Sequence, residues 1–204
     1  MERPTGFRWS KVVPGLAIVL VVGAIFWFSR QMDPGNPAAN ANWPTKYVDV
    51  PAITTARTVP ADSANLAPAA RVLGVSIGDW HRAYPLERLS KSRSHIVNDV
   101  LDGQAFSVAY CDRTDCARLF KKPGHSGPLD LAVGGWFNED GSTDMLVRVG
   151  PNRYRLKSGD ALDPAAPAFP YEAIEIETTT WHAWRTAHPT TDVFLEAIPV
   201  GLLN

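Results

Sequence analysis

The sequence lacks a surplus of positive charge. Its 204 residues include 20 Lys and Arg against 21 Asp and Glu, for a formal net charge of −1. From Met32 onward the balance becomes more acidic, with 16 basic and 20 acidic side chains. Nucleic-acid-binding domains need a basic face that neutralises phosphates. The composition therefore argues against this class, and we expect no nucleic-acid partner.

Cysteine is scarce and the common catalytic motifs are missing. Cys111 and Cys116 are the only two cysteines, and they form neither a C-x-x-C nor a C-x-x-C-H pattern. The five histidines do not fall into an H-E-x-x-H motif, and no N-x-S/T acceptor indicates eukaryotic secretion. These absences remove the thioredoxin-like, covalent-haem and zinc-protease signatures. We expect a non-enzymatic protein and predict no cofactor.

One long uncharged run is present near the N-terminus. Residues 12–28 read VVPGLAIVLVVGAIFWF, and with its flanks the segment 12–32 is long enough to cross a bilayer. Bulky residues follow the run where a signal peptidase needs small ones, which favours an uncleaved anchor over a signal peptide. Three basic residues precede the run and one follows it. The positive-inside rule then places residues 1–11 in the cytoplasm and the rest in the periplasm of a bacterial inner membrane.

Residues 33–68 are rich in Pro, Ala and Asn and show no sustained period of 2 or 3.6. Such composition is typical of an extended, mobile tether. We therefore expect this segment to link the anchor to a folded domain that occupies residues 69–204.

After the tether, the sequence consists of short apolar or alternating runs separated by Gly, Asp, Asn and Pro. This pattern is typical of antiparallel strands. Asp102-Gly103 and Asp140-Gly141 are hairpin turn signals. One helix is expected in TTTWHAWRTAHP, where a threonine can cap the start and Pro189 ends it. A short helical turn is expected at 86–91. The fold class is therefore α+β: a β-rich antiparallel domain with one C-terminal helix, preceded by a single transmembrane helix.

The two cysteines admit two interpretations. In an oxidising compartment, a local disulfide between Cys111 and Cys116 is the default. The alternative is a copper or zinc site that combines the two thiolates with a histidine, His95 being the first candidate. A thiol-redox role would require an accessible cysteine with a low pKa.

Two further patterns have ordinary explanations. The segment from Gly74 to Gly78 matches G-x-S-x-G, but DWHRAYP follows it where a hydrolase requires a helix. A hairpin is the better interpretation, and a nucleophilic Ser76 remains a distant alternative. Asn98 and Asp99 precede a predicted turn, so their expected role is turn hydrogen bonding.

Several stretches together resemble one bacterial family, domain of unknown function 3179. They are VLGVSIGDWHRAYPLERLS, IVNDVLDGQAFSVAYC, LAVGG and TTTWHAWRTAHPTTDVF, in that order between residues 71 and 194. The resemblance implies an exported β-rich domain that is often membrane-anchored, and it carries no established activity.

Two functional hypotheses remain. The first is an anchored accessory subunit of a larger membrane complex, respiratory or photosynthetic, whose partners are integral-membrane proteins. Small residues in the span and aromatic residues in and after it would form the contacts: Gly15, Ala17, Gly23, Ala24, Trp27, Trp43 and Tyr47. The alternative is a periplasmic metal-binding or thiol-redox protein that uses Cys111 and Cys116.

Overall fold

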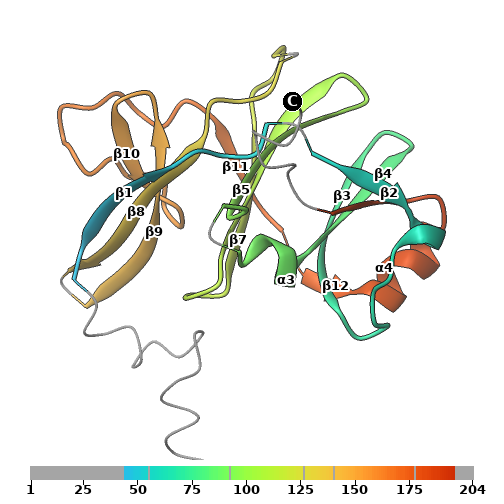
Figure 1. Ribbon diagram of the computed structural model, residues 1–204. Helices are drawn as coiled ribbons and strands as arrows, with labels where there is room; N and C mark the ends of the chain where they lie inside the picture. The colour runs from blue at the N-terminus through green and yellow to red at the C-terminus, as the bar shows by residue number, and fades with distance from the viewer. Residues whose placement is uncertain are drawn as a thin grey trace, which may run out of the picture.

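The computed structural model describes residues 44–54, 56–91, 93–125, 127–139, 141–176 and 178–195. Three β-sheets lie side by side in it, with a short helix packed on one end (Figure 1). The predicted β-rich architecture with a C-terminal helix is confirmed. The predicted span, residues 12–32, lies outside the described residues. Within the described ranges, no helix is both long and apolar enough to cross a bilayer.

The first sheet, which we call sheet A, has the strand order β1-β8-β9-β10. Its strands are β1 (Lys46–Val50), β8 (Ala132–Glu139), β9 (Ser142–Val149) and β10 (Asn152–Arg155). Sheet B has the order β11-β7-β6-β5. It consists of β11 (Glu172–Glu175), β7 (Cys116–Lys121), β6 (Gln104–Cys111) and β5 (Ile96–Leu101). All neighbours in both sheets are antiparallel.

Sheet C has the order β12-β3-β4-β13-β2. Its strands are β12 (Thr178–Thr180), β3 (Arg71–Ile77), β4 (Trp80–Pro85), β13 (Asp192–Phe194) and β2 (Thr58–Pro60). The pair β4 and β13 is parallel, unlike the other pairs of this sheet. The helices among the described residues are the 3-10 turn η2 (Ala61–Ser63), α3 (Leu86–Leu89) and α4 (Trp181–Ala187).

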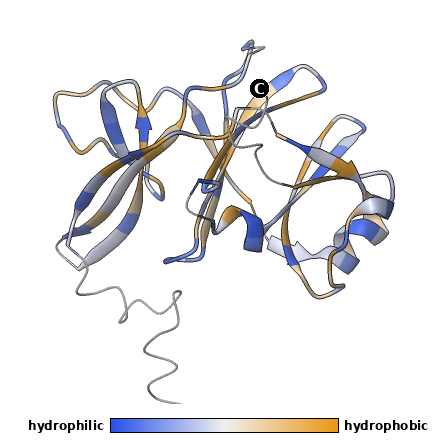
Figure 2. Ribbon diagram, viewed as in Figure 1, coloured by the Kyte–Doolittle hydropathy of each residue, from blue (hydrophilic) through white to orange (hydrophobic). Residues whose placement is uncertain are grey.

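Sheet B lies between the other two sheets, and its strand β6 is buried on both faces. Phe106, Val108 and Tyr110 face a core shared with sheet C. Ala105 and Ala109, whose side chains point the other way, belong to a core shared with sheet A. Strands of all three sheets contain apolar segments (Figure 2). A third, smaller core lies between sheet C and α4.

Local sequence signals account for the turns and the helix. Asp102 and Gly103 have φ values of 49° and 70°, as a two-residue hairpin of type I′ requires, and they join β5 to β6. The Thr180 side chain accepts a hydrogen bond from the Ala183 backbone N–H at 3.2 Å and so caps α4. The predicted hairpin around Gly78 is also confirmed, because β3 and β4 pair across it.

The folded unit begins earlier than residue 69. Residues 44–68, which the composition assigned to a free tether, contain β1, β2 and η2. Ile53 is buried, with 5% of its surface exposed, and its backbone N–H donates to Ile96 O at 3.1 Å. Isolated backbone pairing of this kind needs no periodic side-chain pattern, which is why the sequence did not indicate it. The predicted boundary at residue 69 is therefore corrected, because the folded unit includes the described residues 44–68.

Candidate functional site

A cavity of about 390 Å³ opens between sheet A and the β6–β7 turn. Most of its lining is apolar, and the remainder includes a histidine, a cysteine and both signs of charge. The lining residues are Pro44, Lys46, Val48, Val50, His95, Cys111, Asp112, Arg113, Val133, Gly135, Trp136 and Met145. Binding pockets for small molecules are commonly concave, mainly apolar and about 300–1,000 Å³ in volume. We therefore take this cavity as the candidate site.

One wall of the cavity depends on a bulge in β8. The pairing of β1 with β8 shifts register between Tyr47 and Val50, and that of β8 with β9 shifts between Val133 and Gly135. Gly135 has a φ of 126°, and a Cβ there would lie 2.1 Å from Lys46 O. Only glycine allows the two backbones to approach so closely. Bulges bend a strand locally and are frequent beside functional sites.

The polar side chains of the cavity have distinct surroundings. His95 donates from Nδ1 to Tyr110 O at 3.1 Å. The Arg113 guanidinium lies over the Trp136 ring, 4.8 Å from its centroid. Burial lowers the pKa of Arg113. The indole N–H of Trp136 is buried and has no hydrogen-bond partner among the described residues.

The structure brings the two cysteines together. Cys111 and Cys116 are directly opposite each other in the β6–β7 pair, both are buried, and both thiols are free. Opposed residues of antiparallel strands have Cα atoms about 4.5–5.5 Å apart, which lies within the range that a disulfide spans. The predicted disulfide is thus not formed in this structure, although the pairing of the strands can accommodate it.

The alternative uses of the cysteines gain no support. Burial raises the pKa of both thiols, which disfavours the thiolate that redox exchange requires. His95 and Cys111 line the same cavity. However, no group of three or more His, Cys, Asp or Glu side chains in the described part of the chain has a geometry that could hold a metal.

The predicted interface residues are largely outside the described ranges: Gly15, Ala17, Gly23, Ala24, Trp27 and Trp43. Tyr47 is described and is 59% exposed on β1. Its ring lies 5.2 Å from the Arg153 guanidinium, which also bonds Asp49 Oδ1 at 2.8 Å. Tyr47 and Asp49 alternate along β1 with the residues that line the cavity, so they face the opposite side of sheet A.

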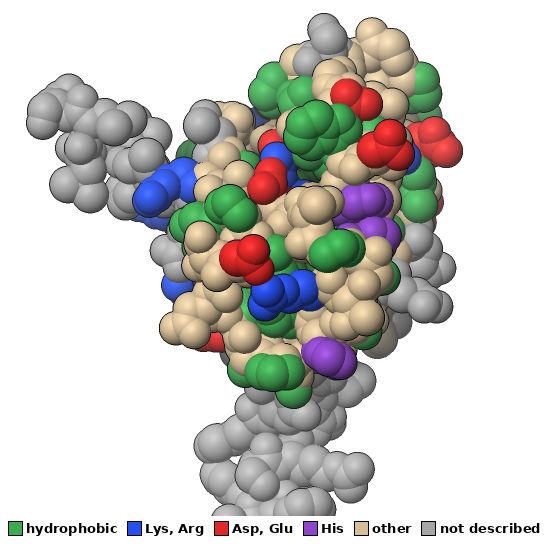
Figure 3. Space-filling view, turned by 90° about the vertical axis from the view of Figure 1, so that its right-hand side faces the viewer, with side chains coloured by type: hydrophobic (Ala, Val, Ile, Leu, Met, Phe, Trp, Pro, Cys, Tyr) green, Lys and Arg blue, Asp and Glu red, His purple; other side chains and the backbone are tan. Residues whose placement is uncertain are grey.

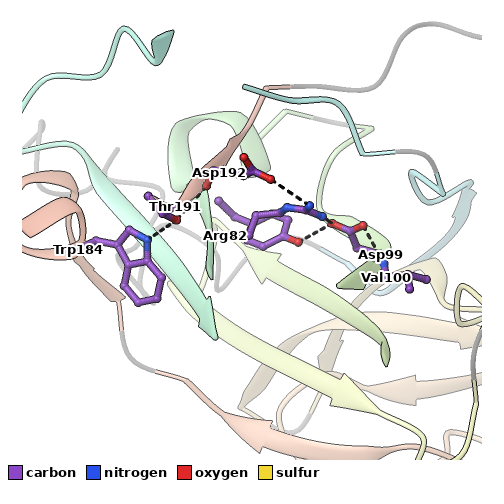
Figure 4. A network of polar contacts seen from close by, with 7 residues as sticks. Arg82, Asp99, Val100, Trp184, Thr191 and Asp192 are labelled. Carbon is purple, nitrogen blue, oxygen red and sulfur yellow. Dashed lines mark hydrogen bonds and ion pairs between the residues drawn. The ribbon is translucent and has the colours of Figure 1, made fainter. Parts of the chain in front are cut away.

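A buried polar network that no sequence motif indicates joins sheets B and C (Figure 4). Asp99 accepts hydrogen bonds from Arg82 at 2.7 Å and from the Tyr84 hydroxyl at 2.6 Å. Burial, together with the negative charge of Asp99, raises the pKa of Tyr84 well above its ordinary value, so this hydroxyl remains a donor. Asp192 lies 3.5 Å from the other side of Arg82. The role expected for Asp99, turn hydrogen bonding, is therefore wrong, because Asp99 is a buried strand residue.

Asn98 is likewise buried, inside β5. Its Nδ2 donates to Leu131 O at 2.9 Å, and its Oδ1 accepts from the Ser107 hydroxyl. It joins the loop before β8 to sheet B. Asn98 and Asp99 lie shortly before a true turn at Asp102. Asn and Asp are common in turns, which explains why the sequence suggested a turn role for both residues.

Ser76 lies on the regular strand β3, opposite His81 of β4. Its hydroxyl shares a hydrogen bond of 2.8 Å with His81 Nδ1. The His81 ring packs at a tilt against His188, with centroids 4.0 Å apart, and the His188 ring is likewise tilted against Trp184. A nucleophile elbow needs a sharp strand-to-helix turn, and β4 follows here instead. Histidine, apolar and charged side chains mix on this end of the molecule (Figure 3).

The comparisons with known proteins agree with the resemblance noted in the sequence. The family model "Protein of unknown function (DUF3179)" matches residues 48–199. No curated protein and no solved structure matches the chain. The matched segment begins within β1 and covers every later strand described above. The chain therefore belongs to the DUF3179 family.

Proposed function

We propose that this protein is a membrane-anchored accessory subunit of a larger bacterial membrane complex, such as a respiratory or photosynthetic one. Its predicted N-terminal span fixes it in the inner membrane, and its β-rich domain lies on the periplasmic face. The domain contacts an integral-membrane partner through β1.

The observation that carries this proposal is the character of β1. It is an outer strand of sheet A, so one of its edges has no neighbouring strand in that sheet. Tyr47 and Val48 are 59% and 39% exposed, and Trp80 is the third exposed large hydrophobic side chain of the described residues. Exposed edges with apolar side chains associate readily with other chains, and proteins without partners usually protect them.

The length of chain before β1 restricts where the partner lies. The predicted span ends at Met32 and β1 begins at Lys46, so 13 residues separate them. A fully extended chain of this length reaches at most about 45 Å. A strand held this close to the bilayer favours a partner whose exposed part is itself near the membrane. The residues of the span with small side chains would add helix contacts within the bilayer.

Purification in mild detergent from the native membrane tests the proposal, with mass analysis of the proteins that co-purify. We expect integral-membrane partners in a fixed ratio. The variant Tyr47→Ser, which leaves the cavity-lining residues of β1 unchanged, should reduce their recovery, whereas Trp80→Ser, on sheet C, is the matched control and should not. Recovery of the wild-type protein alone would refute the accessory role. Full recovery with Tyr47→Ser would refute only the assignment of β1 as the contact.

A further inference from the structure

We propose that the cavity between sheet A and the β6–β7 turn binds a compact amphipathic anion, an apolar molecule that carries one carboxylate. This inference does not depend on the accessory role proposed above. It rests on the size of the cavity, on its apolar walls, on an unpaired hydrogen-bond donor and on its charges.

The walls determine the body of the ligand. Val48, Val50, Val133 and Met145 line the cavity together with the Trp136 ring. These side chains come from β1, β8 and β9, three adjacent strands of one sheet. Apolar surface removed from water contributes about 25 cal/mol per Å² of binding free energy before the cost of association. At about 390 Å³, the cavity is near the lower end of the usual range for ligand sites, which favours a compact molecule.

Trp136 supplies the first polar requirement. Its side chain lines the cavity and its residue is 5% exposed, yet its buried Nε1–H has no partner among the described residues. A buried donor without an acceptor costs about 1–3 kcal/mol. Buried indole N–H groups usually find a partner. The N–H is shielded from solvent, so a ligand oxygen reaches it only when the ring turns on binding, and the oxygen then supplies the missing acceptor.

The charges of the lining supply the second requirement. Lys46 and Arg113 contribute two positive charges and Asp112 one negative charge, so the lining carries a net positive charge. Arg113 lies over the Trp136 ring, which places its guanidinium beside the aromatic wall. Burial disfavours the charged form of Arg113, the negative charge of Asp112 offsets part of that cost, and a bound anion would offset more of it. A guanidinium also matches the geometry of a carboxylate.

The backbone that frames the cavity is fixed before any ligand enters. The close approach of Lys46 and Gly135 fixes the bulge between β1 and β8, and it leaves no room for a side chain at Gly135. The opposite side is the end of β6, where Cys111 lies in a regular strand pair. Both sides are therefore backbone held by strand pairing, so little backbone entropy is lost when a ligand enters.

Equilibrium dialysis of the full chain in phosphatidylcholine nanodiscs tests the proposal, with empty nanodiscs as the blank. The probes are 2-naphthoate, which is an aromatic carboxylate, and 2-naphthalenemethanol, which has the same rings without the charge. We expect saturable binding of 2-naphthoate that is stronger than binding of the alcohol. Because an anionic lipid shares the chemistry of a free acid, phosphatidylglycerol nanodiscs form a second arm. Unchanged binding there assigns the site to free acids, whereas competition assigns it to a lipid.

Two variants identify the contacts. Trp136→Phe keeps an aromatic ring but removes the donor, and we expect it to weaken both probes about two- to tenfold. Arg113→Gln should weaken 2-naphthoate about tenfold or more and leave the alcohol unchanged. Trp80→Phe and Arg185→Gln, both remote from the cavity, are the matched controls and should bind like the wild type. Circular dichroism verifies that each variant is folded.

The proposal fails if the wild-type protein binds no more 2-naphthoate than empty nanodiscs do. It also fails if folded Trp136→Phe and Arg113→Gln both bind 2-naphthoate as strongly as the wild type. Since the two variants alter different parts of the cavity, misfolding of one still leaves the other as a test.

Discussion

Asp99 is the residue on which three strands converge. Its carboxylate lies in β5, accepts hydrogen bonds from Arg82 and Tyr84 of β4, and also accepts from the backbone N–H of Val100 at 2.8 Å. Arg82 in turn pairs with Asp192 of β13. The side chains of Arg82 and Asp99 are only 12% and 9% exposed. Buried charges of this kind are tolerated because each has a partner of opposite sign.

The change Asp99→Asn should destabilise the fold strongly. It leaves the Arg82 guanidinium buried without its main counter-charge, and removal of one partner of a buried pair costs about 3–5 kcal/mol. Asp192→Asn is the control because it removes the longer, more exposed contact of the same arginine, and it should cost less than about 1 kcal/mol. Urea unfolding followed by tryptophan fluorescence measures both. Equal losses for the two variants would contradict the assigned importance of Asp99.

The sequence could not reveal this network. Asn98 and Asp99 are polar residues close to a genuine Asp-Gly turn, and their surroundings therefore suggested turn chemistry. Both faces of β5 are covered, so five of its six residues are buried, polar ones included. A strand covered on both faces does not show the alternation that distinguishes strands from turns. The partners of Asp99 are 15 and 17 residues away, and only the folded sheets bring them close.

At the level of elements, helix α4 packs on sheet C through one close contact. A Cβ added at Gly74 of β3 would lie 2.0 Å from the Trp184 ring, so the indole packs directly on the strand backbone. The Trp184 Nε1–H donates to the Thr191 hydroxyl at 3.0 Å, which fixes the ring (Figure 4). Gly74 is therefore required for this packing by space rather than by backbone conformation.

The change Gly74→Ala should displace α4 from sheet C. Overpacking of this kind costs about 1–3 kcal/mol. Gly127→Ala is the control, because a Cβ there meets nothing within 4 Å. Thermal unfolding measures the stability of both single variants and of the double variant Gly74→Ala with Trp184→Leu. The second change should restore part of the loss, since the smaller side chain leaves room for the methyl group. If the stability losses of Gly74→Ala and Trp184→Leu simply add in the double variant, the contact does not control the packing.

Elements with local signals were predictable and elements with remote partners were not. Some features depend only on residues that are neighbours in the sequence, and the structure contains each of these. They are the helix cap at Thr180, the helix end before Pro189 and the turn at Asp102-Gly103. β13 has only three residues, and it pairs with β4 and with β2. Neither pairing has a signature within a short window of sequence. The cavity has the same character, because its walls come from five separate segments.

For the molecule as a whole, residues 44–68 are an integral part of the folded domain. β1 completes sheet A, Ile53 enters the core between sheets B and C, and β2 completes sheet C. Their proline-rich composition resembled a tether because each contact uses only a few backbone groups. The segment thus crosses all three sheets without forming any long regular element.

A chain that starts at residue 69 should be much less stable than one that starts at residue 44. The shorter chain exposes the apolar surface that Ile53 covers and leaves additional strand edges unpaired. We expect rapid cleavage of the shorter chain by a dilute protease and a cooperative thermal transition only in the longer one. Equal protease resistance of the two chains would show that residues 44–68 contribute little to the fold.

The position of β13 also has a consequence for biosynthesis. β13 lies between β4 and β2, so these two strands have no connection through sheet C until residues 192–194 are available. A ribosome makes β2 more than 130 residues before it makes β13. Contacts this distant in the chain form slowly. The nascent chain therefore exposes two open strand edges during nearly the whole of its synthesis, when incomplete chains are prone to aggregate. A chaperone that holds extended segments would protect it until β13 leaves the ribosome.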